Sequence, residues 1–185
     1  MEGLLLRARA GWVTAPWPRT QALTTARLVL EPLHPDHARE LAPVLADPAL
    51  HAFTGDEPEN EERLRARYTR QAVGQSPDGA HGWLNWVARD RATQAPVGTV
   101  QATISDGDDG RSAELAWVIA TSRQGEGLAT EAAGAVMEWL RDQGVARFVA
   151  HIHPDHGASA GVARHLGLAA TDVRHAGEVR WVLVV

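Results

Sequence analysis

Residues 113–140 constrain the fold most, because a strand pattern, a glycine turn and a helix pattern follow one another there. Residues 113–119, Ala-Glu-Leu-Ala-Trp-Val-Ile, are typical of a strand. After Gly125 and Gly127, apolar residues recur at helical spacing: Leu128, Ala132, Ala135, Val136, Trp139 and Leu140. Glycines let successive N–H groups turn towards one point, and a helix start adds unpaired donors and a positive dipole end. The pattern favours an anion site, usually for phosphate, although a tight turn that binds nothing has the same sequence.

Two familiar phosphate loops do not fit these residues. A Walker A loop ends in Gly-Lys-Ser or Gly-Lys-Thr, whereas Gly127 is followed by Leu128 and Ala129. A Rossmann fingerprint has three glycines and an acidic residue about twenty positions later, where this chain has Val145. Both classes are therefore excluded.

The loop resembles the acyl-coenzyme A signature of the GNAT superfamily of N-acetyltransferases, Gln/Arg-x-x-Gly-x-Gly/Ala, at residues 124–129. Residues 25–33 resemble the first strand of the branch that acetylates ribosomal-protein N-termini. Residues 154–159 and 165–168 are similar to that branch's Asn-x-x-Ser helix and Leu-Gly-Phe ending. The resemblance implies acetyl-CoA as co-substrate, bound by the main chain of Gln124, Gly125, Glu126, Gly127, Leu128, Ala129 and Thr130.

The 185 residues suit one domain, which we place at 24–185 after an N-terminal extension, 1–23, outside the resemblance. The extension has no sustained period but carries tryptophans through which it could pack. Its only apolar run, residues 4–6, is too short for a signal peptide or a membrane span. The chain has no cysteine, which is compatible with a reducing cytoplasm and excludes a disulfide framework or cysteine nucleophile. Its net charge of −5 argues against nucleic acid as a partner. The sequence does not decide between a monomer and a homodimer.

Hydrophobic periods and turn signals predict an α/β (α+β) fold in the GNAT arrangement, a mixed and mostly antiparallel sheet flanked by helices on both faces. Helices are expected from residue 34 to 47, over 59–75, after the glycine loop and over 158–166. In the helix at 59–75, Leu64, Tyr68 and Ala72 mark the inner face. Strands are expected at 27–33, 83–89, 96–105, 112–120, 147–153, 167–174 and 178–184. The coenzyme is expected to enter where neighbouring strands diverge.

Acetyl transfer from a thioester to an amine requires positioning, a polarised carbonyl and a deprotonated nucleophile. With ordinary pKa values, an α-amine is roughly 10–15% neutral at pH 7 and a lysine about 0.04%. An N-terminal α-amine could therefore react with the help of a weak or water-relayed base. The acceptor is an amine of this kind, or alternatively a small molecule such as a polyamine, amino acid or aminoglycoside. A non-catalytic acyl-CoA-binding domain is a further alternative.

The resemblance assigns catalytic roles to two residues. Glu114 corresponds to the glutamate that acts as base through water, and Ser159 to the serine that protonates the departing thiolate. Alternatively, Glu114 is a carboxylate that is solvated or paired with an arginine, and Ser159 is a hydroxyl that caps a helix. His156 stands where the branch has asparagine, which puts that coenzyme contact in doubt. Polarising N–H groups are expected from Trp117, Val118 or Ile119.

A competing pattern lies at residues 151–156, His-x-His-x-Asp-His, which spells the metal-ligand motif of metallo-β-lactamase-fold hydrolases. Three imidazoles and a carboxylate suit zinc, and His151 and His153 share a strand face. That fold needs further ligands far downstream, whereas only 29 residues follow His156. We therefore expect no metal site. The acceptor pocket is expected from the first two helices, the loop at 53–58 and the last hairpin, with Asp56, Glu57, Glu59 and Glu178 as candidate cation-attracting charges.

Overall fold

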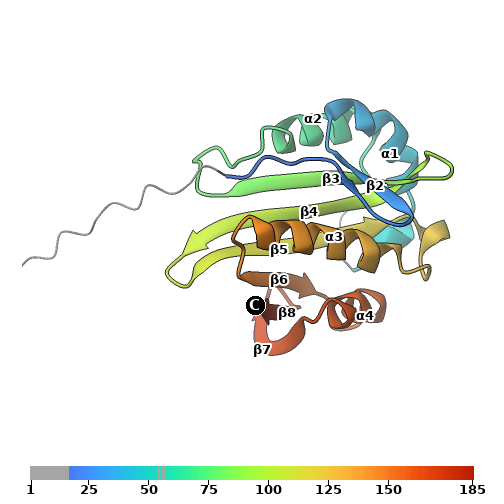
Figure 1. Cartoon of the computed structure of the whole chain (residues 1–185). Helices are drawn as coiled ribbons and strands as arrows, with labels where there is room; N and C mark the ends of the chain where they lie inside the picture. The colour runs from blue at the N-terminus through green and yellow to red at the C-terminus, as the bar shows by residue number, and fades with distance from the viewer. Residues whose placement is uncertain (1–16, 54, 56) are drawn as a thin grey trace, which may run out of the picture.

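The computed structural model describes residues 17–53, 55 and 57–185. These residues form a single sheet with helices packed on both of its faces (Figure 1). The strands are β1 (Leu23–Thr24), β2 (Leu28–Pro32), β3 (Gly82–Asp90), β4 (Pro96–Gly107), β5 (Gly110–Ile119), β6 (Arg147–Ile152), β7 (Ala169–His175) and β8 (Glu178–Val184). The helices are α1 (Ala38–Leu45), α2 (Glu61–Gln71), α3 (Leu128–Asp142) and α4 (Gly157–His165), with 3-10 turns at Pro35–His37, Pro48–His51 and Thr121–Arg123.

The strand order in the sheet is β1-β2-β3-β4-β5-β6-β8-β7. Neighbouring strands are antiparallel except β5 and β6, which are joined through α3 and run parallel. The β5–β6 pairing covers only Ser112–Glu114 against Arg147–Val149, so the two strands separate beyond Glu114. The predicted mixed, mostly antiparallel sheet is confirmed, and so is the expectation that neighbouring strands diverge.

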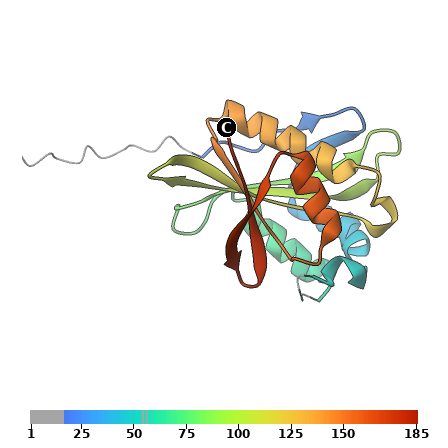
Figure 2. The same ribbon diagram turned by 90° about the horizontal axis from the view of Figure 1, so that it is seen from below.

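Two hydrophobic clusters fix the helices on opposite faces. On one face, α3 and α4 pack on the sheet, and Trp86 of β3 meets Trp139 of α3 edge to face at 5.7 Å. On the other face, Leu41 of α1 and Leu64 of α2 are buried with Val87 of β3. Figure 1 shows α1 and α2 together along the β2–β3 side, and Figure 2 shows the β7–β8 hairpin beside α4. Because strand side chains alternate between faces, residues 114, 116 and 118 of β5 lie on the α1–α2 face.

Close approach of β4 and β5 depends on Gly98. A Cβ at this position would lie 2.0 Å from the Val118 carbonyl oxygen, so no other residue fits without moving a strand. The pairing of Gly98 with Ile119 marks the end of the ladder, just before the glycine loop. The geometry at this end of β5 is therefore set by backbone contact rather than by side chains.

The predicted elements are present, with three differences. The helix expected from residue 34 to 47 is divided into a 3-10 turn at Pro35–His37 and the shorter α1, Ala38–Leu45. Strand β1 was not predicted, because two residues are too few to carry a period. Helix α2 is shorter than the expected 59–75: it starts after Asn60, whose side chain caps the Arg63 N–H at 2.9 Å, and ends at Gln71 before Gly74, which has φ +83°. Ala72 is consequently exposed, and its predicted place on the inner face is wrong.

Trp17 lies at the N-terminal end of the described chain and packs on the sheet. Its Nε1 donates to the Gly79 carbonyl at 3.0 Å, its ring covers Gly82, and the Arg111 guanidinium lies 5.1 Å from its ring centroid. Within the described residues, no helix is long and apolar enough to cross a membrane.

Candidate active site

The glycine loop presents a row of main-chain donors. Gly125 and Gly127 have φ of +79° and +77°, a region that L side chains rarely adopt, and Gly127 begins α3 without a side-chain cap. Among the described residues, no main-chain or side-chain acceptor takes the N–H groups from Gly125 to Thr130, and the first helix bond is Glu131 N–H to Gly127 at 3.1 Å. These consecutive free N–H groups at a helix start are suited to a phosphate.

Ion pairs fasten this loop to the two turns beside it. Arg123 bonds Asp90 of β3 at 3.0 Å and Glu126 at 2.8 Å. Two N–H bonds from the following turn, together with Arg123, lower the pKa of Asp90 to about 2. Arg27 bonds Glu131 at 2.6 Å and donates to the Glu126 carbonyl at 2.9 Å. The donors are therefore held in place before any ligand binds.

The end of β5 supplies further free N–H groups. Ala120 N–H donates to Val97 of β4 at 2.8 Å, and N–H directions alternate along an antiparallel strand. Val118 N–H accordingly faces β4, whereas the N–H groups of Trp117 and Ile119 face the gap opened by the departure of β6. Gln124 closes the loop against this strand, since its Nε2 donates to the Ile119 carbonyl at 3.1 Å. Of the three predicted polarising donors, Trp117 and Ile119 face the gap and Val118 does not.

Glu114 is the last β5 residue paired with β6 and lies on the α1–α2 face. Its side chain is 56% exposed, and one carboxylate oxygen lies 3.1 Å from Nδ1 of His151 on β6. Thr103 of β4 is directly opposite. Glu114 is thus neither fully solvated nor paired with arginine, and it stands at the point where the gap begins.

Ser159 and His156 lie at the start of α4. The Ser159 hydroxyl makes no hydrogen bond with the described residues, so the capping role considered from the sequence is not observed. His156 stacks on Phe53 with ring centroids 4.3 Å apart, and His153 lies 5.4 Å from the same ring. Burial, and secondarily His153, lower the pKa of His156, which keeps the stacked ring neutral at pH 7. This contact joins the loop after Pro48–His51 to the α4 end of the site.

The metal-binding interpretation of residues 151–156 finds no support in the geometry. Across the described residues, no group of three histidine, aspartate or glutamate side chains is arranged to hold a metal ion. His151 turns to Glu114, while His153 and His156 pack on Phe53. The motif is therefore divided between two sets of neighbours.

A cavity of about 640 Å³ lies between α2 and the sheet, on the face that carries Glu114. Its floor includes Asn85 of β3 and Gln101 of β4, which are opposite each other, and Gln101 is in turn opposite Ala116 of β5. The Tyr68 hydroxyl, from α2, is buried without a partner among the described residues. Burial raises the pKa of Tyr68 to about 12, so the phenol remains a donor at neutral pH. Glu114 lies outside the lining of this cavity, two residue pairs beyond Gln101–Ala116 along β4 and β5 and on the same face of the sheet.

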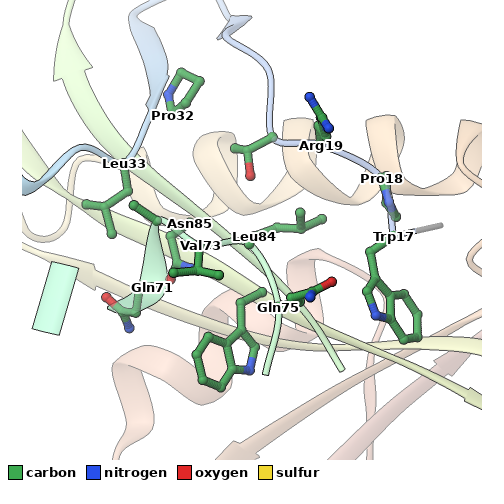
Figure 3. Close-up of a pocket in the computed structure, with 14 residues that line it drawn as sticks. Trp17, Pro18, Arg19, Pro32, Leu33, Gln71, Val73, Gln75, Leu84 and Asn85 are labelled. Atoms are coloured by element: carbon green, nitrogen blue, oxygen red, sulfur yellow. The ribbon is translucent and has the colours of Figure 1, made fainter. Parts of the chain in front are cut away.

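A second cavity of about 560 Å³ lies next to the first, on its β2–β3 side. Trp17, Pro18 and Arg19 form one side of it, and the end of α2 and β3 form the other (Figure 3). The two cavities share Leu33, Gln71 and Asn85. The two cavities are therefore adjacent, and their combined lining, here called the trough, extends from Val118 of β5 to Trp17 in the N-terminal segment.

A cavity lies beside most of the elements from which the acceptor pocket was predicted. Residues of α1, α2 and the loop after Pro48–His51 line the first cavity, including Glu57 and Glu59, and Glu59 lies 2.7 Å from Arg67. The last hairpin does not line it: Glu178 lies on β8 opposite His175. Asp56 is outside the described residues.

The chain belongs to the GNAT acetyltransferases, because the model of the acetyltransferase (GNAT) domain family matches residues 27–169. By family, the protein is an N-acetyltransferase. Among curated protein sequences no significant match was found.

Three solved structures of similar fold place the chain in context. A GNAT-family acetyltransferase from Bacillus anthracis has a TM-score of 0.71 at 16% identity, covering 89% of this chain and 98% of its own. The RimL ribosomal L7/L12 α-N-protein acetyltransferase, in complex with coenzyme A, has a TM-score of 0.72 at 16% identity, with 89% and 98% covered. The microcin C7 self-immunity acetyltransferase MccE, in complex with acetyl-CoA and AMP, has a TM-score of 0.70 at 15% identity. The match covers 87% of this chain and 94% of MccE.

Proposed function

We propose that the protein transfers the acetyl group of acetyl-CoA to a primary amine, with the α-amine of a peptide or protein N-terminus as the preferred acceptor. The observation that carries the coenzyme assignment is the row of free N–H groups from Gly125 to Thr130, which fits a pyrophosphate. Arg123 and Arg27 keep this row in position. Leu128, Ala129 and Thr130 contribute through their N–H groups at the helix start, where their side chains need not touch the ligand.

Each catalytic group has a separate task in this proposal. Bound acetyl-CoA supplies an activated thioester. The Trp117 and Ile119 N–H groups polarise its carbonyl in the gap between β5 and β6. The Glu114 carboxylate takes a proton from the acceptor ammonium, directly or through water, and the freed amine attacks the carbonyl carbon. The Ser159 hydroxyl gives its proton to the departing thiolate sulfur and regains one from the new amide nitrogen, whose second proton is released as the C–S bond breaks.

The trough favours an extended acceptor over a compact one. From Asn85 of β3 through Gln101 of β4 to Val118 of β5, the lining of the first cavity crosses two strand spacings, roughly 10 Å, and the second cavity extends it to Trp17. The side-chain amides of Asn85 and Gln101 and the Tyr68 hydroxyl lie along this length and suit hydrogen bonds to the amides of a peptide behind its N-terminal amine. A small amine is the second candidate, because the first cavity alone, at about 640 Å³, is of small-molecule size. The cytoplasm, where coenzyme and nascent proteins meet, is the proposed location.

Thiol release from acetyl-CoA, followed with a thiol reagent in metal-free buffer, tests the function. The acceptors are N-terminal peptides of one to six residues, polyamines, amino acids and aminoglycosides. We expect acceptor-dependent release that rises with peptide length up to about three residues. Release with small amines alone would select the second candidate. If no acceptor causes thiol release but coenzyme A still raises the melting temperature, the protein is a domain that binds the coenzyme without transferring its acetyl group.

Tyr68→Phe tests the acceptor cavity. The hydroxyl has no partner among the described residues, so its removal is expected to leave the melting temperature unchanged or slightly higher. If the hydroxyl donates to the acceptor, KM for the acceptor rises about two- to tenfold, the worth of one neutral hydrogen bond. Steady-state kinetics at saturating acetyl-CoA measures this change.

A matched control lies on the same helix. The Thr69 hydroxyl is on the exposed side of α2 and donates to the Arg65 carbonyl at 2.8 Å. Thr69→Val should leave KM for the acceptor unchanged. Equal kinetics in Tyr68→Phe and the unmodified protein for every acceptor would remove Tyr68 from the acceptor site.

A further inference from the structure

His151 is the one histidine of the 151–156 motif that contacts the candidate base. Its Nδ1 lies 3.1 Å from Oε1 of Glu114. The contact follows from the sheet register: Glu114 is paired with Val149, and His151, two residues further along β6, projects from the same face. The ring therefore reaches across the start of the gap between β5 and β6.

The imidazole is better held than the carboxylate. The His151 side chain is 18% exposed and that of Glu114 is 56% exposed. The ring of His175, at the end of β7, lies 5.6 Å from the His151 ring. On β8, Arg180 is directly opposite His151, so it projects from the same face. The charged or titratable groups that face His151 are thus Glu114 from β5, His175 from β7 and Arg180 from β8.

An exposed glutamate samples many rotamers, and restricting them costs conformational entropy that the reaction would otherwise have to supply. A donor fixed on a neighbouring strand removes part of that cost. With Oε1 engaged by His151, Oε2 remains available on the open side of the strand. The contact thereby determines which carboxylate oxygen meets the acceptor.

We propose that His151 is a positioning residue for acetyl transfer, its Nδ1–H donating to Oε1 of Glu114 so that Oε2 receives the acceptor proton. This inference rests on the function proposed above. In the step, the acceptor ammonium passes one proton to Oε2, the nitrogen lone pair forms the C–N bond, and the C–S bond breaks with its electrons going to sulfur. The second proton that leaves the nitrogen reaches sulfur by way of the Ser159 hydroxyl. His151 gains and loses no proton, and it acts only through the orientation of Glu114.

The test compares two substitutions of His151. In His151→Asn the side-chain NH₂ takes the approximate place of Nδ1–H, whereas His151→Leu offers no donor. We expect kcat to fall roughly ten- to a hundredfold in His151→Leu, the factor of one hydrogen bond to a charged group, and to recover to within a few-fold in His151→Asn. Coenzyme A affinity and melting temperature should stay near those of the unmodified protein in both.

Two further measurements separate positioning from a structural role. His165→Asn alters a histidine of α4 whose ring bonds its own helix at the Gly161 carbonyl, and it should leave kcat unchanged. The double variant with Glu114→Gln and His151→Leu should be no slower than Glu114→Gln alone, because His151 acts through Glu114.

Three outcomes overturn the inference: unchanged kcat in His151→Leu, equal losses in the leucine and asparagine variants, or additive losses in the double variant. Each of these is measured against an unmodified protein that transfers acetyl groups. An unmodified protein that transfers none to any acceptor would instead overturn the proposed function, so the two failures are distinguishable.

Discussion

Gly127→Trp is expected to abolish binding of coenzyme A, lowering its affinity by at least about a hundredfold. Gly127 is the N-cap of α3, and the N–H groups from Gly125 to Thr130 are free of acceptors among the described residues. An indole at this position fills the space in front of those donors. Losing two or three bonds to charged phosphate oxygens, at roughly 1.5–3 kcal/mol each, accounts for the size of the effect. Calorimetric titration with coenzyme A measures it.

The control must reproduce the backbone strain without touching the loop. Gly127 has φ +77°, where any side chain is disfavoured by about 1–2 kcal/mol, so some loss of stability follows from the backbone alone. Gly144, just beyond the other end of α3, has φ +83°, and a Cβ there would meet open space. Gly144→Trp should therefore lower the melting temperature to a similar degree and keep coenzyme affinity. Equal affinities in the two variants would refute the assignment of the loop.

The loop could be predicted from the sequence because its signal is local. A strand, two glycines and an amphipathic helix follow one another within residues 113–140, and the donors come from the main chain. The ion pairs that hold the loop could not be predicted. Arg27 and Glu131, for example, are 104 residues apart in sequence, and only the folding of the chain brings them into contact. Asp90 likewise reaches Arg123 from the end of β3.

On the α1–α2 face, too, the sequence predicts local features of a side chain but not its contacts with distant elements. The two-residue period predicts His151 and His153 on one strand face, but β6 ends at Ile152 and His153 packs on Phe53 instead. The choice between metal ligand and hydrogen-bond donor for His151 depends on the neighbouring strand. For Tyr68, the sequence indicates only the inner face of an early helix. Its relevance to the acceptor cavity follows from the packing of α2 over the sheet, which leaves its hydroxyl buried without a partner among the described residues.

Glu114→Gln is expected to lower kcat at pH 7 by about a hundredfold or more, the usual range for loss of a general base being roughly 10²–10⁴. The amide keeps the shape of the side chain and can still meet His151, but it cannot accept the proton of an ammonium. Coenzyme affinity should be unaffected, because the glycine loop lies beyond the far end of β5. Glu138→Gln, an exposed carboxylate of α3, is the matched control and should have normal kcat.

The pH dependence identifies the step that fails. An α-amine has an ordinary pKa of about 7.7–8.0, so near pH 9 most of the acceptor is neutral before it binds and needs no base. The deficit of Glu114→Gln relative to the unmodified protein should therefore shrink as pH rises from 7 to 9 with an N-terminal peptide. With a lysine-like amine, whose ordinary pKa is about 10.4, the deficit should persist over the same range. A deficit that is constant for both acceptors would mean that Glu114 binds or orients the substrate and does not remove its proton.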